Sequence, residues 1–401
     1  MIDQGLYLRQ RRDLLPRLPR PVPAERVDAE MSALQGVILG SDRPGTAVTR
    51  RVVARHDASL SARVVRSTPL KYAGGADPLL DRSAHVRAGS GLVWAGPRLM
   101  IVQDDANFVA LVDPASGTVT ARTMPAGDGG RRQFDDASGN KAHKLDLEAV
   151  VSIPPGDGGP LAVAFGSGST SRRERVVTLR GMEEADGHEL VAVHAAAAFY
   201  EQLRASIPFA GSELNIEGAV YLPRASGGRL RLFNRGNGAR RAGVEPTNAT
   251  CDVEWRVLAA YLACPDVSAP PHPTDVVQYD LGVIGGLALT FTDASVVLVD
   301  AASDSRWTLY TAAAEASPDA TRDGPVAGVA VGVIAEGGGR IVARWALLRD
   351  QGGDPFMGKV EGIALRPDDP GRGYLVVDRD AHDVASELCE VVLEGAWLAP
   401  V

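Results

Sequence analysis

The 401-residue chain contains only three cysteines, Cys251, Cys264 and Cys389. Three are too few for a disulfide framework, so they form either one bridge or, as we expect, free thiols. Its seven histidines are scattered, and no two stand at the spacing that zinc ligands require. The sequence therefore argues against both a disulfide scaffold and a zinc site.

Long apolar runs are also missing. No segment approaches the roughly 18 apolar residues of a membrane span, and the N-terminal arginines precede no apolar stretch of about 7–15 residues. We therefore expect a cytoplasmic protein with no membrane partner. The net charge of −8 gives no basic face for phosphate backbones, which excludes nucleic acid as an expected partner.

Two common catalytic motifs are absent as well. There is no Gly-x-Ser-x-Gly elbow that would carry a serine nucleophile. The segment Gly166-Ser167-Gly168-Ser169 resembles a phosphate loop, but it lacks the Lys-Ser/Thr ending and a following helix. We interpret it as a hairpin turn.

The chain does contain a short recurring sequence motif, which we call the phrase. A glutamate followed by a tiny residue opens an apolar strand at Leu147-Glu148-Ala149, Ile216-Glu217-Gly218 and Val360-Glu361-Gly362. The same phrase without its glutamate recurs at Ser90-Gly91-Leu92, Gly286-Leu287-Ala288 and Gly328-Val329-Ala330. The intervals cluster near the roughly 40–50 residues of one propeller blade.

The repeat, together with 44 glycines and 26 prolines as turn residues, predicts an all-β, six-bladed β-propeller. We expect blades to begin at residues 91, 147, 216, 276, 326 and 360. The last blade is one strand short, so residues 46–55 or 62–67 should close it and protect an edge. Residues 195–204 predict one short helix, residues 1–45 an N-terminal arm packed on its own domain, and residues 46–401 a single propeller domain.

The geometry of an antiparallel meander brings these glutamates together. The start of the first strand and the end of the second lie at the same end of a sheet, and first strands line the central channel. Glu148, Glu217 and Glu361 should therefore converge at one channel mouth. The residues that end the second strands should join them: Gln103, Asp104, Asp105, Ser167, Asn234, Arg235, Thr292, Asp293, Arg344, Asp378, Arg379 and Asp380.

These motifs resemble the esterase-like activity of phytase family and, more loosely, calcium-dependent lactonase and gluconolactonase propellers. The resemblance covers roughly residues 85–395 and rests on the three glutamate phrases and Gln103-Asp104-Asp105. It implies a six-bladed propeller and a hydrolase.

Converging carboxylates must be met by a cation, by arginines or by raised pKa values. Ca²⁺ takes about 6–8 oxygen ligands, so Glu148, Glu217, Glu361, Asp104 and Asp378 form one candidate metal set. The equally weighted alternative is a network of these glutamates with Arg235, Arg344 and Arg379.

The remaining candidates concern catalysis and substrate. His143 and the three glutamates are candidate acid–base residues. Asn234, Arg235, Arg344, Arg379, Arg172 and Arg240 are candidate binding residues for a small anionic molecule, since guanidinium groups match phosphate or carboxylate oxygens. For Arg172 and Arg240 the alternative is that solvated turns simply carry arginine.

Two functions follow from these candidates. The first is a metal-dependent hydrolase of a phosphoester or lactone, in which the metal activates water and a carboxylate is the base. The second is a non-catalytic propeller scaffold that binds a ligand or a protein partner. The fold alone does not distinguish them.

Overall fold

The computed structural model describes residues 49–157, 161–182, 190–224, 227–300, 305–322 and 324–399. The expected arm, residues 1–45, lies outside the described residues. Within them, the regular secondary structure is mainly antiparallel β-strand. The three cysteines are free, with Cys251 and Cys389 buried.

The strands form five consecutive antiparallel units, which we call blades. Blade 1 consists of β4 (Gly89–Ala95), β5 (Arg98–Gln103), β6 (Phe108–Val112) and β7 (Val119–Thr123). Blade 2 consists of β8 (Leu147–Ile153), β9 (Leu161–Gly166), β10 (Arg175–Arg180) and β11 (Leu190–Ala195). Blade 3 consists of β12 (Ile216–Leu222), β13 (Arg229–Asn234), β14 (Asn248–Glu254) and β15 (Thr274–Asp280).

The last two blades share one ten-stranded sheet. Blade 4 consists of β17 (Leu287–Asp300), β18 (Ser305–Glu315), β19 (Val326–Gly337) and β20 (Arg340–Arg349), preceded by the short β16 (Val283–Ile284). Blade 5 consists of β21 (Lys359–Arg366), β22 (Asp369–Asp378), β23 (Glu387–Glu394) and β3 (Ser61–Pro69). Strand β20 joins the two blades because it also pairs with β3.

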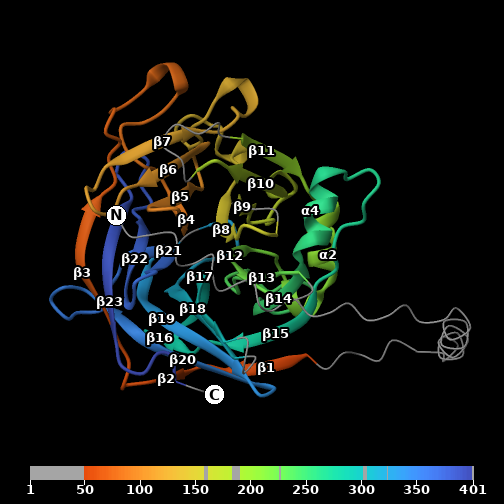
Figure 1. Cartoon of the computed structure of the whole chain (residues 1–401), viewed down its shortest axis with the longest axis vertical. Helices are drawn as coiled ribbons and strands as arrows, with labels where there is room; N and C mark the ends of the chain where they lie inside the picture. Colours follow the sequence, from red (N-terminus) through yellow and green to blue (C-terminus); the bar gives the residue numbers. More distant parts are fainter. Residues whose placement is uncertain are drawn as a thin grey trace, which may run out of the picture. The chain divides into compact units, whose positions relative to one another are not determined.

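The first strands of the blades form a closed ring. β4 contacts β8, β8 contacts β12, β12 contacts β17, β17 contacts β21, and β21 contacts β4 (Figure 1). The described residues therefore form a propeller, which confirms the all-β propeller fold, but the ring has five blades rather than six. The count differs because Gly328 lies in β19, the third strand of blade 4, and does not open a blade.

An N-terminal strand closes the last blade, as expected. β3 pairs antiparallel with β23 from Pro69↔Glu387 to Ser61↔Glu394, so the choice of residues 62–67 is confirmed (Figure 1). Residues 46–55, the other candidate for the closing strand, instead contain β1 (Arg50–Val53), which pairs in parallel with β15 of blade 3. The short β2 (Arg55–His56) pairs in parallel with β20 of blade 4.

Three α-helices interrupt blades 2 and 3 in the described residues. The expected helix is present as α2 (Ala197–Ala205), followed by α3 (Ile207–Ala210). α4 (Trp255–Ala263) follows β14 directly, and its residues Trp255, Leu258 and Leu262 follow helical spacing and bury one face. Short 3-10 helices span Pro78–Leu80, Asp128–Gly130, Lys141–His143 and Ser171–Arg173. Of the helices described, none has the length and apolar character to cross a membrane.

The repeated phrase marks a break in strand register. In every innermost strand, pairing with the second strand skips one residue: Gly91, Glu148, Glu217, Thr292 and Glu361. Such a β-bulge bends the strand and re-aims a side chain. In blade 4 the bulge lies at Thr292, whereas the expected phrase at Gly286 lies in the turn between β16 and β17.

The tiny residue of the phrase allows neighbouring blades to approach closely. A Cβ on Gly362 would lie 2.6 Å from Val376 Cγ1 and 2.8 Å from Leu92 Cβ of blade 1. A Cβ on Gly218 would lie 3.2 Å from the backbone nitrogen of Ala294 in blade 4. The phrase therefore combines a close contact between blades with a polar side chain directed by a bulge.

Candidate functional site

The three glutamates lie around one small polar cavity at the centre of the ring. Glu148, Glu217 and Glu361 come from the bulges of β8, β12 and β21, and all three line a cavity of about 40 Å³. The other lining residues come from every blade: Asp104, Lys144, Asp146, Arg173, Asn215, Arg235, Asn237, Ala320, Thr321, Arg322 and Lys359. The meander geometry thus brings the glutamates together.

Each glutamate has its own hydrogen-bonding partner. Glu148 Oε2 accepts a hydrogen bond of 2.7 Å from Ser90 Oγ, across the boundary between blades 1 and 2. Glu217 Oε1 accepts one of 2.7 Å from Asn215 Nδ2 and lies 3.4 Å from a nitrogen of Arg235.

Glu361 is only half satisfied. Its Oε1 lies 3.1 Å from Lys359 Nζ, whereas its buried Oε2 has no hydrogen-bond partner among the described residues. The Glu361 side chain is 4% exposed, so this bare oxygen is enclosed by protein. It shares this property with Asp104 Oδ1, so it is one of at least two carboxylate oxygens of the cavity without a hydrogen-bond partner among the described residues.

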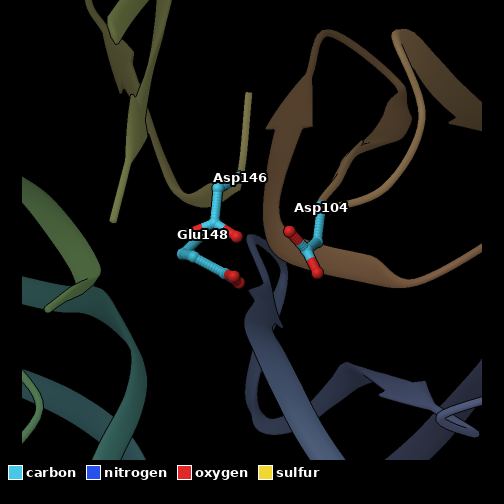
Figure 2. A group of neighbouring side chains, drawn as sticks. All are labelled: Asp104, Asp146 and Glu148. Atoms are coloured by element: carbon cyan, nitrogen blue, oxygen red, sulfur yellow. The ribbon is translucent and has the colours of Figure 1, made fainter. Parts of the chain in front are cut away.

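A lysine stands among the acids on the blade 1 and blade 2 side. The carboxylates of Asp104, Asp146 and Glu148 turn toward a common space, with ligand atoms within 4.8 Å of one another (Figure 2). Lys144 Nζ lies 2.6 Å from Asp104 Oδ2 and 2.7 Å from Asp146 Oδ1. Arg173 also contacts Asp146, at 3.0 Å.

This arrangement bears on the expected calcium site. The ammonium group of Lys144 takes the place between two carboxylates that a bound cation would need, and Glu217 and Glu361 contact the cationic side chains of Arg235 and Lys359. A Ca²⁺ ion needs about 6–8 oxygens, so the residues in this arrangement do not fit it. Calcium binding stays a prediction, which metal titration of the purified protein would test.

Burial shifts the acid–base properties of the cavity. Burial, reinforced by the negative charge of Asp146, raises the pKa of Glu148 to about 7. Burial also raises the pKa of Glu361 to about 7, although Lys359 opposes the shift. Asp146 behaves oppositely: burial would raise its pKa, but Lys144 and Arg173 lower it to about 2. Near neutral pH, the Asp146 carboxyl group is ionised, whereas the Glu148 and Glu361 carboxyl groups are each partly protonated.

An acidic cleft of about 370 Å³ adjoins the cavity. Asp104, Lys144 and Thr321 line both spaces. The cleft carries six aspartates and few cationic groups; its polar residues are Asp104, Asp105, Asp135, Asp136, Asp378, Asp380, Lys141, Lys144, Thr321 and His382. Burial raises the pKa of Asp378 to about 7.

The sequence-predicted residues divide into two groups. Glu148, Glu217, Glu361, Asp104 and Arg235 line the cavity, and Asp378 lines the cleft. The others lie elsewhere: His143, Arg172, Arg240, Asn234, Arg344 and Arg379 line neither space.

The residues outside the site have their own partners. His143 Nδ1 lies 2.7 Å from Asp128 Oδ2 and 2.9 Å from Arg172 Nη1, in an exposed cluster. Arg240 pairs with Glu245 at 3.0 Å, at the surface. Their roles as catalytic or binding residues stay predictions that this arrangement does not favour.

The three remaining residues have structural contacts. Asn234 Oδ1 accepts a hydrogen bond of 2.8 Å from the backbone nitrogen of Asn215, so it positions the strand that carries Glu217. Arg344 contacts Asp57 at 3.0 Å, because β20 is the outer strand of blade 4 rather than a second strand. Arg379 contacts Glu387 at 2.7 Å. The expected glutamate–arginine network is therefore formed by Arg235, with lysines in place of Arg344 and Arg379.

Three further cavity residues share a position in the sequence that could have identified them. Asp146, Asn215 and Lys359 each stand two residues before a phrase glutamate. Asp146 and Asn215 directly precede β8 and β12, and Lys359 opens β21, so each stands at the start of the strand that carries its glutamate and lines the cavity with it. Glu315 follows the second-strand rule: it ends β18 and contacts Arg235.

Comparison with known proteins gives one family and several distant folds. The profile of a Family of unknown function (DUF6929) matches residues 85–393, whereas the sequence resemblance had pointed to the esterase-like activity of phytase family. No curated protein sequence matches the chain.

Solved structures align over most of the chain at low similarity. The GH93 alpha-L-arabinofuranosidase of Fusarium graminearum shares 8% identity at a TM-score of 0.36, covering 85% of this chain and 96% of that one. The pyranose dehydrogenase PQQ domain from Coprinopsis cinerea shares 11% identity at a TM-score of 0.35, covering 86% and 100%.

Proposed function

The chain belongs to the family of unknown function whose profile it matches, and we propose that it is a hydrolase that uses Glu148 and Glu361 as a general acid and a general base. The observation that carries this proposal is the pair itself. Two buried carboxyl groups, each with a pKa of about 7, line one cavity at the ring centre. A catalytic acid or base works best when its pKa lies near the working pH.

The surroundings support a role for each member of the pair. Ionised Asp146 disfavours a second negative charge on Glu148, and on this ground we assign the acid to Glu148. The ammonium of Lys359 favours the ionised form of Glu361, whose bare Oε2 is the base. Because the two carboxyl groups repel each other's charge, one is protonated while the other is ionised.

The reaction is ester hydrolysis. Glu361 Oε2 takes a proton from a water molecule whose oxygen attacks the ester carbonyl carbon. Glu148 then donates its proton to the leaving alcohol oxygen as the carbon–oxygen bond breaks. A cavity of about 40 Å³ holds a water molecule, which occupies about 30 Å³, and the cleft of about 370 Å³ holds the substrate.

The charge of the cleft selects the class of substrate. Five of its six aspartates are already paired with a cation: Asp104 with Lys144, Asp105 and Asp135 with Arg87, Asp136 with Lys141, and Asp380 with Lys359. Both lysines of the lining are therefore engaged and offer no free charge to a phosphate, which favours a neutral carboxylic ester or lactone. We therefore propose the ester or lactone rather than the phosphoester as substrate.

A substrate screen with matched variants tests the proposal. Lactones, carboxylic esters and phosphoesters are offered to the wild-type protein, to Glu148→Gln, to Glu361→Gln and to a control, Glu201→Gln, at an exposed position on α2. We expect ester or lactone hydrolysis with a bell-shaped pH profile centred near 7, a loss of about 10²–10⁴-fold in kcat for the first two variants, and no loss for the control. Hydrolysis that persists in Glu148→Gln and Glu361→Gln would contradict it.

One observation favours a second function, a non-catalytic scaffold. Each carboxylate of the cavity already contacts a cation, an amide or a hydroxyl, and such pairing is also how a purely structural core is neutralised. For a scaffold we expect no turnover in the screen, and a gain in stability at neutral pH for both glutamine variants.

A further inference from the structure

A groove lies on the outer side of the ring, apart from the central site. It has a volume of about 860 Å³ and runs between β1 of blade 3 and β20 of blade 4, lined by residues 51–53, 55–58 and 340–344. The two strands contact each other, and β2 closes one end by pairing with Arg344 and Trp345.

Both walls of the groove are sheet edges. β1 pairs with β15 along one edge, and within the described residues its other edge has no strand partner. Residues 340–343 of β20 pair with β19 on one side, and no described strand pairs with them on the other. Backbone N–H and C=O groups along these edges are thus available to a further strand.

The side chains of the groove combine apolar walls with a basic rim. Val52, Ile341 and Val342 line it partly exposed, and Val53 is 61% exposed. The rim carries the charged residues Arg51, Arg55, Asp57, Arg340 and Arg344, together with His56.

Most of the positive charge of the rim has no ion-pair partner in the described part of the chain. The single aspartate of the lining, Asp57, pairs with Arg344 at 3.0 Å. Arg51, Arg55 and Arg340 are exposed and make no ion pair with any other described residue. Within the described residues, a chain with a net charge of −8 thus gathers three arginines without an ion pair beside two strand edges that have no strand partner.

From these edges and charges we propose that the groove binds an extended acidic segment of a partner protein by strand addition. The backbone of the segment pairs with the edge of β1 or β20, while its side chains alternate between the apolar walls and the arginine rim. Charge complementarity sets the class of partner: acidic residues that alternate with β-branched apolar ones.

A synthetic probe tests this directly. The probe is a fluorescent peptide of about eight residues that alternates aspartate with valine, long enough for one strand. Its binding to the full chain is followed by fluorescence anisotropy at low and high salt. We expect saturable binding that weakens with salt and falls at least about tenfold when Arg51, Arg55 and Arg340 are changed to Glu. The matched control is Arg372→Glu on β22, an exposed arginine remote from the groove.

A second pair of probes separates strand addition from charge attraction. The first is the acidic probe with every second backbone amide N-methylated, so that it cannot donate hydrogen bonds along one edge. The second is the same peptide with each aspartate replaced by lysine. Strand addition predicts that both bind at least about tenfold more weakly than the acidic probe. Equal binding of the N-methylated probe, or undiminished binding to the charge-reversed variant, would overturn the proposal. No binding of the acidic probe would also overturn it and would leave the arginines as a guard against edge-to-edge association.

Discussion

Ser90 Oγ in blade 1 donates a hydrogen bond to Glu148 Oε2 in blade 2 at 2.7 Å. Ser90 stands one residue before the register break of β4 and Glu148 stands at the register break of β8, so adjacent blades contact each other directly at these breaks. The backbone nitrogen of Ile363 in blade 5 likewise donates to Asp293 Oδ2 of blade 4 at 2.8 Å. The repeat therefore builds one hydrogen-bonded centre from separate blades, and its properties can be tested residue by residue.

Stability should fall as the pH rises toward neutrality. Glu148 and Glu361 have a pKa near 4.5 when unfolded and about 7 when folded, so between these values the unfolded state binds fewer protons. Their contribution is complete below about pH 4.5 and is lost by about pH 7, at up to about 3 kcal/mol per group. Urea unfolding across this range measures it. The slope should be smaller in Glu148→Gln, which has no proton to lose; an unchanged slope would refute the shift.

Removing Lys144 should destabilise the fold strongly. Lys144→Met leaves the carboxylates of Asp104 and Asp146 without their shared ammonium, at a cost of about 3–5 kcal/mol in the free energy of unfolding. The control is Lys141→Met, whose ion pair with Asp136 is exposed and contributes about 0–1 kcal/mol. Denaturant unfolding compares the two variants, and equal losses would show that Lys144 is not the counter-charge of the cavity.

Truncation should separate the closing strand from what precedes it. A chain that begins at residue 49 keeps β1, β2 and β3, and we expect it to unfold cooperatively near the wild-type Tm. A chain that begins at residue 71 lacks β3, exposes the edge of β23 and loses the buried Ala62 and Val64. We expect circular dichroism to detect no cooperative transition for it. Similar melting of both chains would argue against closure by β3.

Filling the close contact between blades should be costly. Gly362→Ala places a Cβ 2.6 Å from Val376 and 2.8 Å from Leu92, which forces neighbouring strands apart and costs about 1–3 kcal/mol. Gly74→Ala is the control, because its Cβ would lie 3.8 Å from the nearest atom, on the flexible side chain of Arg82. Thermal unfolding distinguishes them; a neutral Gly362→Ala would mean that the blades can move apart freely.

The sequence predicts a ring of propeller blades correctly, but it predicts six blades where the described residues form five. A glutamate at the start of an apolar strand is unusual enough to identify β8, β12 and β21. A glycine within an apolar strand is not, so the prediction that Gly328 in β19 opens a blade is wrong. The distinguishing feature is that β19 pairs with strands on both sides, β18 and β20, whereas β21 pairs with β22 alone, and this is not visible in one strand alone.

The counter-charges of the site were harder to predict than its acids. Lys144 follows a 3-10 helix in a loop, and the path of that loop, rather than strand periodicity, brings its ammonium between two aspartates. Arg235 contacts Glu315, which is 80 positions away in the sequence, only because blades 3 and 4 are neighbours in a closed ring. The position two residues before each phrase glutamate would have located Asp146, Asn215 and Lys359, which all stand where a first strand begins.

The segment from Arg50 to Pro69 contributes β1 to blade 3, β2 to blade 4 and β3 to blade 5. It therefore acts as a belt across three consecutive blades. Because one continuous segment is hydrogen-bonded into three blades, the unfolding of any one of them displaces strands of the other two, and we expect the three blades to unfold together.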